Sequence, residues 1–180
     1  QRAAERGRLV AQVDRFCQAT AAAATIILSE LDVTSADVET ALRNRLADSR
    51  QSELERNRIR LALLKVDPEQ LDSIFDYLQS ERSAQLDAAE LLLIRAALVP
   101  NGPELAPNFE SLLSAPRQRL RSASLLAGFA PQGDWCSAHA EGIAADLVRV
   151  LPSQLAPYRD ALRPIYPHLV APLTTICRDS

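Results

Sequence analysis

The chain has 180 residues, of which 47% are hydrophobic and 24% are charged, and its formal net charge is -3. This composition allows a substantial buried core, argues against a disordered protein, and gives no global attraction to nucleic acid or to an anionic membrane. Three scattered cysteines, Cys17, Cys136 and Cys177, argue against a disulfide framework and predict a reducing, cytoplasmic location. No apolar run reaches the roughly 18 residues that a membrane span needs.

The first two helices are expected at about residues 2–18 and 20–31, as an antiparallel pair. The chain begins inside the helix-like pattern of residues 2–16, and we therefore expect a fragment of a longer protein. The next helix start is marked by Thr34-Ser35-Ala36-Asp37, which resembles a capping box with an acid in the first turn.

Four prolines then recur at a nearly constant spacing: Pro68, Pro100, Pro131 and Pro164 lie 32, 31 and 33 residues apart. Proline cannot continue a helix and pushes the preceding residue out of the helical region, so each proline predicts a helix end. The helices that end there, here named the B helices, are expected at about residues 51–65, 82–98, 117–129 and 152–162. Pro68 is also expected at the first position of the following helix.

Between the B helices lie the predicted A helices, which carry an i, i+3, i+4 triplet on one helical face. The triplets begin at Val38, Leu71, Leu105, Ala140 and Leu169, which are 33, 34, 35 and 29 residues apart. A period in the thirties is typical of repeat proteins. We therefore predict an all-α fold, namely an α-solenoid of antiparallel helical pairs of the HEAT/armadillo type with about five repeats. Residues 1–180 are expected to form a single domain, with an N-terminal helical pair at 1–33 and HEAT-like repeats over 34–180.

Three stretches also resemble a known family: RLALLKVDPEQL at 60–71, RQRLRSASL at 117–125 and YRDALRPIYPHLVAPLTTICRD at 158–179. They are similar to the HEAT-like repeat region of large planctomycete-type bacterial multidomain proteins, often serine/threonine protein kinases. The resemblance covers about residues 50–180 and brings no catalytic residue with it. It implies a non-catalytic repeat segment attached to an enzyme, with further repeats after Ser180.

The sequence itself carries no catalytic motif. Five scattered glycines form no kinase Gly-rich loop, P-loop or dinucleotide fingerprint. Cys136 and His139, three residues apart, could share a face as metal ligands, but a zinc site needs four ligands and structural roles for both are favoured. We therefore predict no enzyme activity for this segment, no metal or other cofactor and no small-molecule substrate.

The candidate partner-binding residues are four arginines and one tryptophan. Arg56 and Arg58 precede Pro68 by twelve and ten residues, and Arg119 and Arg121 precede Pro131 by the same distances. On a concave B-helix face they could bind a partner, whereas the alternative is a solvated face paired with nearby acids. Trp135 is either an exposed anchor or a plug between two repeats.

The function expected from these residues is that of a scaffold for protein-protein interaction or for docking a domain of the parent protein. The alternative is a nucleic-acid-binding HEAT-like domain, which the negative net charge and the interrupted arginine stripe disfavour.

Overall fold

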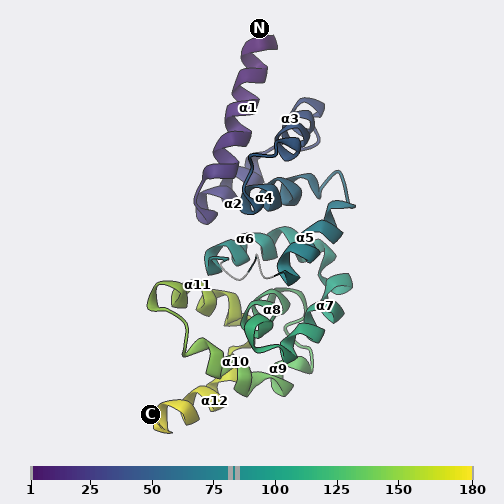
Figure 1. Ribbon diagram of the computed structural model, residues 1–180. Coiled ribbons are helices and arrows are strands. Elements are labelled where there is room, and N and C mark those ends of the chain that lie inside the picture. The colour runs from purple at the N-terminus through teal and green to yellow at the C-terminus, as the bar shows by residue number, and fades with distance from the viewer. Residues whose placement is uncertain (1, 81–82, 84–85, 180) are drawn as a thin grey trace. The chain divides into compact units, whose positions relative to one another are not determined.

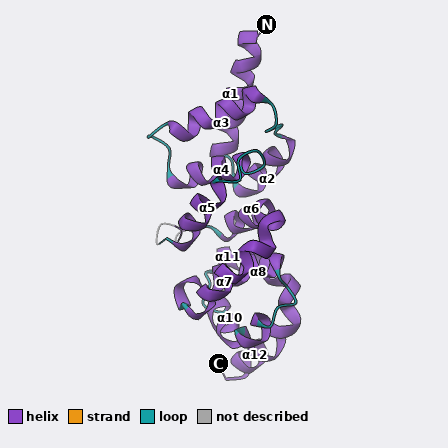
Figure 2. Ribbon diagram, turned by 90° about the vertical axis from the view of Figure 1, so that its right-hand side faces the viewer, coloured by secondary structure: helices purple, strands orange, loops and turns teal. Residues whose placement is uncertain are grey.

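The computed structural model describes residues 2–80, 83 and 86–179, and residues 2–6 by their backbone alone. Every regular element in these ranges is a helix, which confirms the all-α prediction (Figures 1 and 2). None of these helices is both long and apolar enough to span a membrane. The chain divides into two compact units, Gln1–Gln85 and Leu86–Ser180, where the sequence predicted a single domain.

The first unit is built around two helices that both contact several others. Its helices are α1 (Arg2–Gln18), α2 (Ala21–Glu30), α3 (Ala36–Ala47), α4 (Glu53–Leu63) and α5 (Gln70–Gln79). α1 packs against α2, α3 and α4, and α4 packs against α3 and α5 as well. The inner face of α1 buries Val13, Phe16 and Cys17 at the i, i+3, i+4 spacing. The N-terminal pair predicted at 1–33 therefore shares one core with the helices that follow it.

Helix starts in this unit follow local side-chain chemistry. The Ser52 hydroxyl accepts a hydrogen bond from the Glu55 backbone N–H at 3.2 Å, and the Glu55 carboxylate accepts one from the Ser52 N–H at 2.8 Å. This capping box fixes the start of α4. The capping box predicted at Thr34–Asp37 is wrong: Ser35 makes no capping hydrogen bond, and the Thr34 hydroxyl donates instead to Asp32 Oδ1 at 2.6 Å.

The second unit contains seven labelled α-helices over residues 88–179 of the described chain. They are α6 (Ala88–Leu98), α7 (Gly102–Ser111), α8 (Pro116–Phe129), α9 (Trp135–Ala138), α10 (Ala140–Leu147), α11 (Pro152–Leu162) and α12 (Tyr166–Asp179). α8 is the central one, because it packs against α6, α7, α10 and α11. Its residues 122–127 are all buried, as expected of a helix surrounded by others.

The proline spacing predicted the B-helix ends well. α4 ends five residues before Pro68, and α6, α8 and α11 end two residues before their prolines. Two boundaries differ from prediction. The helix expected at 82–98 begins at Ala88, where the Asp87 carboxylate accepts the Ala89 N–H at 2.8 Å, and residues 82, 84 and 85 lie outside the described residues. α5 begins at Gln70, so Pro68 lies in the turn before it.

The A-helix triplets all fall on helices, and most of them face a core. Val38 and Leu42 are buried on α3, and the whole triplet that begins at Ala140 is buried on α10. Asn108 is the exception, because it is exposed on α7 while Leu105 and Phe109 are buried. A polar side chain three positions from Leu105 lies at the edge of the buried stripe and turns to solvent.

Three B helices of the second unit, α6, α8 and α11, pack against one another (Figures 1 and 2). The Ala88 N–H donates to Gln154 Oε1 at 2.8 Å, across 66 positions of sequence. Arg95 Nη1, on α6, donates to the carbonyl oxygens of Ser124 on α8 and Ala161 on α11. In a solenoid each repeat contacts only its neighbours, whereas α11 here reaches back two helical pairs to α6. The predicted solenoid arrangement is therefore not confirmed, and this contact departs from it.

Candidate partner-binding surfaces

Arg58, one of the predicted partner-binding residues, is turned into the first unit. Only 4% of its surface is exposed. Its Nη1 donates to the carbonyl oxygens of Cys17 at 2.9 Å and Ala19 at 2.6 Å, and more distantly to that of Phe16. These carbonyls lie at the C-terminal end of α1, where a helix leaves acceptors unpaired and its dipole is negative. The prediction that Arg58 faces a partner is wrong, because its guanidinium joins α4 to α1.

Arg119 also makes contacts within its own unit. Its Nε donates to the Leu113 carbonyl oxygen at 3.0 Å, and its Nη1 lies 3.2 Å from Asp146 Oδ2 on α10. Both side chains of this ion pair are less than one-fifth exposed, so Arg119 connects α8 with α10. Gly142 makes room for the pair, because a Cβ at that position would lie 2.7 Å from Arg119 Nη1.

Arg121 is half-buried on the same helix, near the hydroxyl of Tyr158. Burial raises the pKa of Tyr158 above its usual range, and the positive charge of Arg121 opposes that rise. Arg121 belongs to the second unit, whereas Arg56 belongs to the first. A binding role for Arg121 stays a prediction.

Trp135 is buried, with 5% of its surface exposed. Its indole Nε1 donates to the Ala130 carbonyl oxygen at 2.9 Å, which closes the connection between α8 and α9. A Cβ at Gly133 would lie 2.4 Å from the indole ring, so the connection passes close to Trp135. The alternative of an exposed anchor is therefore wrong in this structure, whereas a plug between two repeats stays a prediction.

The candidate metal ligands, Cys136 and His139, lie on and just after the short helix α9. The Cys136 thiol donates to the Pro131 carbonyl oxygen at 3.4 Å, and His139 stands at the junction of α9 and α10. His168 Nδ1 lies 3.1 Å from the Ser137 hydroxyl oxygen. Among the residues that the structure describes, no three His, Cys, Asp or Glu side chains come together as metal ligands.

The three thiols differ in exposure. Cys17 and Cys136 are buried, whereas Cys177 is exposed on α12. Burial raises the pKa of the Cys17 thiol from 9.0 to about 11, so Cys17 stays neutral at neutral pH. Neither buried thiol is placed to act as a nucleophile.

Arg56, the remaining arginine candidate, lines a polar pocket between α4 and α5. The pocket encloses about 300 Å³ and is lined by Glu53, Arg56, Arg60, Ser73, Asp76, Tyr77 and Ser80. The side chain of Arg56 has weak contacts only: its Nη2 lies 3.4 Å from the Ser49 carbonyl oxygen and its Nη1 lies 4.0 Å from Glu53. Arg56 is thus a predicted binding residue that faces a hollow of the surface.

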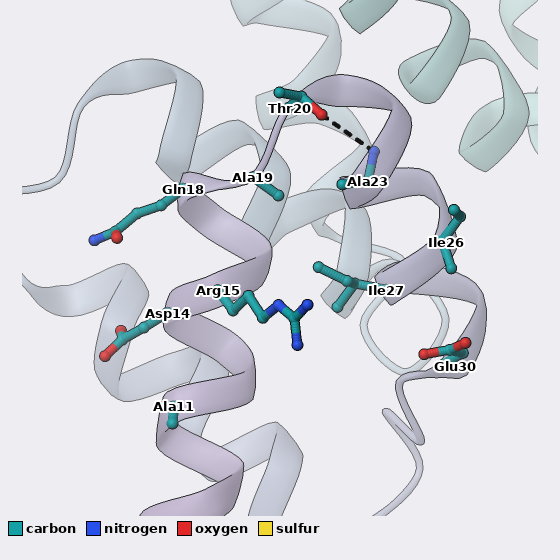
Figure 3. A pocket seen from close by; sticks show the side chains of 10 residues that line it. All are labelled: Ala11, Asp14, Arg15, Gln18, Ala19, Thr20, Ala23, Ile26, Ile27 and Glu30. Atoms are coloured by element: carbon teal, nitrogen blue, oxygen red, sulfur yellow. Dashed lines mark hydrogen bonds between the residues drawn. The ribbon is translucent and has the colours of Figure 1, made fainter.

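A larger groove separates α1 and α2 in the first unit. It measures about 880 Å³ and is open to solvent along its length. Figure 3 shows Arg15 of α1 directed into the space between the two helices, with Ile27 of α2 across from it. Ile26, also on α2, is 60% exposed. Arg15 has no hydrogen bond or ion pair with another described residue. The groove therefore combines apolar side chains with this unpaired cation and with two carboxylates, those of Glu30 and of Asp14, which pairs with Arg45.

Sequence reasoning did not identify this groove, although a signal for it was present. α2 reads AAAATIILSE, and it buries only Ala24 and Leu28. A helix that is apolar on most of its circumference but packs against few neighbours leaves apolar surface exposed.

Arg60 joins Arg56 at the α4–α5 pocket but was not predicted as a binding residue. It lies outside the twelve- and ten-residue spacing from the prolines that marked the predicted arginines.

Comparisons of this chain with family models, with curated proteins and with solved structures give no match. The HEAT-like resemblance and the attached kinase that it implies therefore stay predictions.

Proposed function

We propose that this chain is a non-catalytic helical module that binds protein, either a separate partner or a domain of its own parent protein. The observation that carries the proposal is the groove between α1 and α2, where exposed Ile26 and partly exposed Ile27 adjoin the unpaired Arg15. Apolar residues in a groove between helices favour burial against a partner helix. The resemblance to repeat regions of bacterial serine/threonine kinases makes an attached kinase domain one partner worth testing.

The occupant that fits the groove is an amphipathic helix with one acidic side chain on its apolar face. Its apolar residues would cover Ile26 and Ile27, and its carboxylate would pair with Arg15 away from bulk water. Nucleic-acid binding has less support, because Arg58, Arg95 and Arg119 direct their guanidinium groups to carbonyl oxygens and carboxylates of the protein itself.

The experiment is affinity capture from a bacterial lysate and with a separately produced kinase domain, using the full chain and two variants. Ile26→Asp places a charge in the groove, whereas Val170→Asp places one at an exposed apolar position on α12 of the second unit. We expect a protein retained by the wild type and by Val170→Asp but reduced at least fivefold for Ile26→Asp. Equal retention by all three would contradict the groove as the site, and a low-salt gel shift with duplex DNA or RNA would favour the nucleic-acid alternative.

A further inference from the structure

The α4–α5 pocket gathers hydrogen-bond donors that lack partners. Arg56 and Arg60 stand four residues apart on one face of α4, and Ser73 lies opposite them on α5. Arg56 Nε is buried without a hydrogen-bond partner, and its two terminal nitrogens have only the long contacts to Ser49 and Glu53. Neither Arg60 nor the Ser73 hydroxyl has a partner among the described residues. A buried donor without an acceptor costs free energy, so an acceptor from a ligand would be stabilised here.

Other arginines of the described chain form close hydrogen bonds to carboxylates, unlike Arg56 and Arg60. Arg43 bonds to Glu39 at 2.8 Å and to Asp67 at 3.0 Å. Arg50 bonds to both carboxylate oxygens of Asp48, at 3.0 and 2.9 Å. Arg56 also has a glutamate three residues before it, Glu53. The Nη1 of Arg56 nevertheless lies 4.0 Å from the Glu53 carboxylate, which is a weak contact. The pocket therefore holds guanidinium groups that are available for a planar oxyanion.

The charges of the pocket restrict which oxyanion fits. Two arginines face two carboxylates, those of Glu53 and Asp76, so the lining is neutral as a whole. A phosphate dianion in the pocket would be repelled by the two carboxylates at close range. The phosphates of a nucleic-acid backbone would be repelled in the same way. A single carboxylate accompanied by a cation leaves the formal charge of the lining unchanged. It places an anion beside the two arginines and a cation beside Asp76.

We propose that the α4–α5 pocket binds a short segment of a protein in which an acidic residue adjoins a lysine. The acidic side chain accepts hydrogen bonds from Arg56 and Arg60, and the lysine ammonium donates to Asp76. The pocket volume of about 300 Å³ suits two side chains rather than a folded element. This inference rests on the proposed function, because its ligand is a protein segment, but it concerns a second site apart from the α1–α2 groove.

The test is an NMR titration of the full chain that follows the Nε–Hε signals of its arginines. The probe is the capped peptide acetyl-Ala-Glu-Lys-Ala-amide, and the comparison probes replace its Glu or its Lys by Gln. Inorganic phosphate is titrated separately. We expect saturable shifts of the Arg56 and Arg60 signals with the Glu-Lys peptide and at least fivefold weaker binding of the other three probes. Arg60→Gln should weaken the peptide at least tenfold, whereas Lys65→Gln, which removes a charge of the same sign from an exposed position outside the pocket, should change it less than twofold.

Two results would overturn the inference. One is the absence of saturable shifts at both arginines with the Glu-Lys peptide, and the other is phosphate binding as tightly as that peptide. The amide spectrum of Arg60→Gln shows whether the variant stays folded, and Arg56→Gln provides a second variant if it does not. Either negative result leaves the proposed function intact, because partner capture through the groove is tested separately at Ile26.

Discussion

Arg58 Nη1 donates a hydrogen bond of 2.9 Å to the carbonyl oxygen of Cys17. The two residues lie 41 positions apart in sequence, and their contact joins the middle of α4 to the end of α1. The same nitrogen also donates to the carbonyl oxygen of Ala19, which precedes α2. One buried guanidinium thus links α4 to the end of α1 and to the connection between α1 and α2.

Replacing Arg58 by methionine should destabilise the first unit, because carbonyl oxygens of α1 lose a charged donor that solvent cannot replace. We expect the free energy of unfolding to fall by about 2 kcal/mol, measured by urea denaturation followed by circular dichroism. The matched control is Arg50→Met, because the Arg50 side chain is 86% exposed and exposed ion pairs contribute little to stability. Equal midpoints for the two variants would contradict the structural role of Arg58.

Gly128 and Gly7 should respond in opposite ways to alanine, although both lie in helices. A Cβ on Gly128 would lie 2.4 Å from Arg95 Cδ, whereas a Cβ on Gly7 would meet no atom within 4 Å. Alanine in a helix is favoured over glycine by about 1 kcal/mol, so Gly7→Ala should stabilise the protein by up to that amount. Gly128→Ala should instead lower its melting temperature, because Arg95 must leave its place between α6, α8 and α11. A rise in melting temperature for Gly128→Ala would show that Arg95 is not held there.

Asn57 is a fully buried residue whose side-chain amide has no hydrogen-bond partner at either Nδ2 or Oδ1. Since an unpaired buried polar group costs about 1–3 kcal/mol, Asn57→Leu should raise the free energy of unfolding by about 1 kcal/mol after its larger volume is accommodated. Asn44→Leu, at an exposed position on α3, should leave it unchanged within about 0.5 kcal/mol. Loss of stability in Asn57→Leu would mean that the amide is satisfied in solution, for example by water.

The thiols should react in an order set by burial. At pH 8 we expect a thiol-specific reagent to modify Cys177 within the mixing time of the assay, and Cys17 and Cys136 only after denaturant is added. A native protein that releases more than one equivalent at once would contradict the burial of Cys17 and Cys136. Cys177→Ser is the control, since it should remove the fast phase alone.

The pKa of Cys17 also predicts a loss of stability in alkali. Its thiol has a pKa of about 11 in the folded protein against 9.0 for the free group, because burial disfavours the thiolate. The unfolded chain therefore loses its proton first, and the contribution of Cys17 to stability is complete below about pH 9 and declines between about pH 9 and 11. Cys17→Ala should show a smaller decline over this interval in urea denaturation, and an identical decline would contradict the raised pKa.

The positions of the helices could be predicted from sequence because their signals are local. α6, α8 and α11 end two residues before Pro100, Pro131 and Pro164, as the regular spacing of these prolines predicted. Proline alone does not fix a helix end, because Pro107, Pro157 and Pro172 lie inside helices. The triplets beginning at Val38 and Ala140 could likewise be recognised from helical periodicity alone. The boundary at Ala88 and the capping box at Ser52 also depend on side chains within three residues, and the Ser52–Glu55 spacing is a local signal for the second of these.

The direction of the arginines could not be predicted, because it depends on contacts between segments far apart in sequence. Arg58 and Arg56 differ by only two positions on α4, yet Arg58 faces the end of α1 while Arg56 lines the α4–α5 pocket. Their different surroundings follow from the way α1 packs on α4, which periodicity does not determine. The α6–α11 contact was not predicted for the same reason. Helical pairs of equal length can form an open stack, or they can pack so that helices two pairs apart contact each other, and periodicity does not distinguish the two.

The contact between α6 and α11 limits how this protein can change in evolution. In an open stack, a helical pair can be duplicated or deleted because only the adjoining pairs must adapt. In the second unit, removing the α7–α8 pair would also take away α8, against which both α6 and α11 pack, and inserting a pair would separate Arg95 from Ala161. The contact also spans 66 positions, so much of the unit must be synthesised before it can form. The number of helical pairs between α6 and α11 is therefore fixed by the fold, and growth of the chain can occur only outside them.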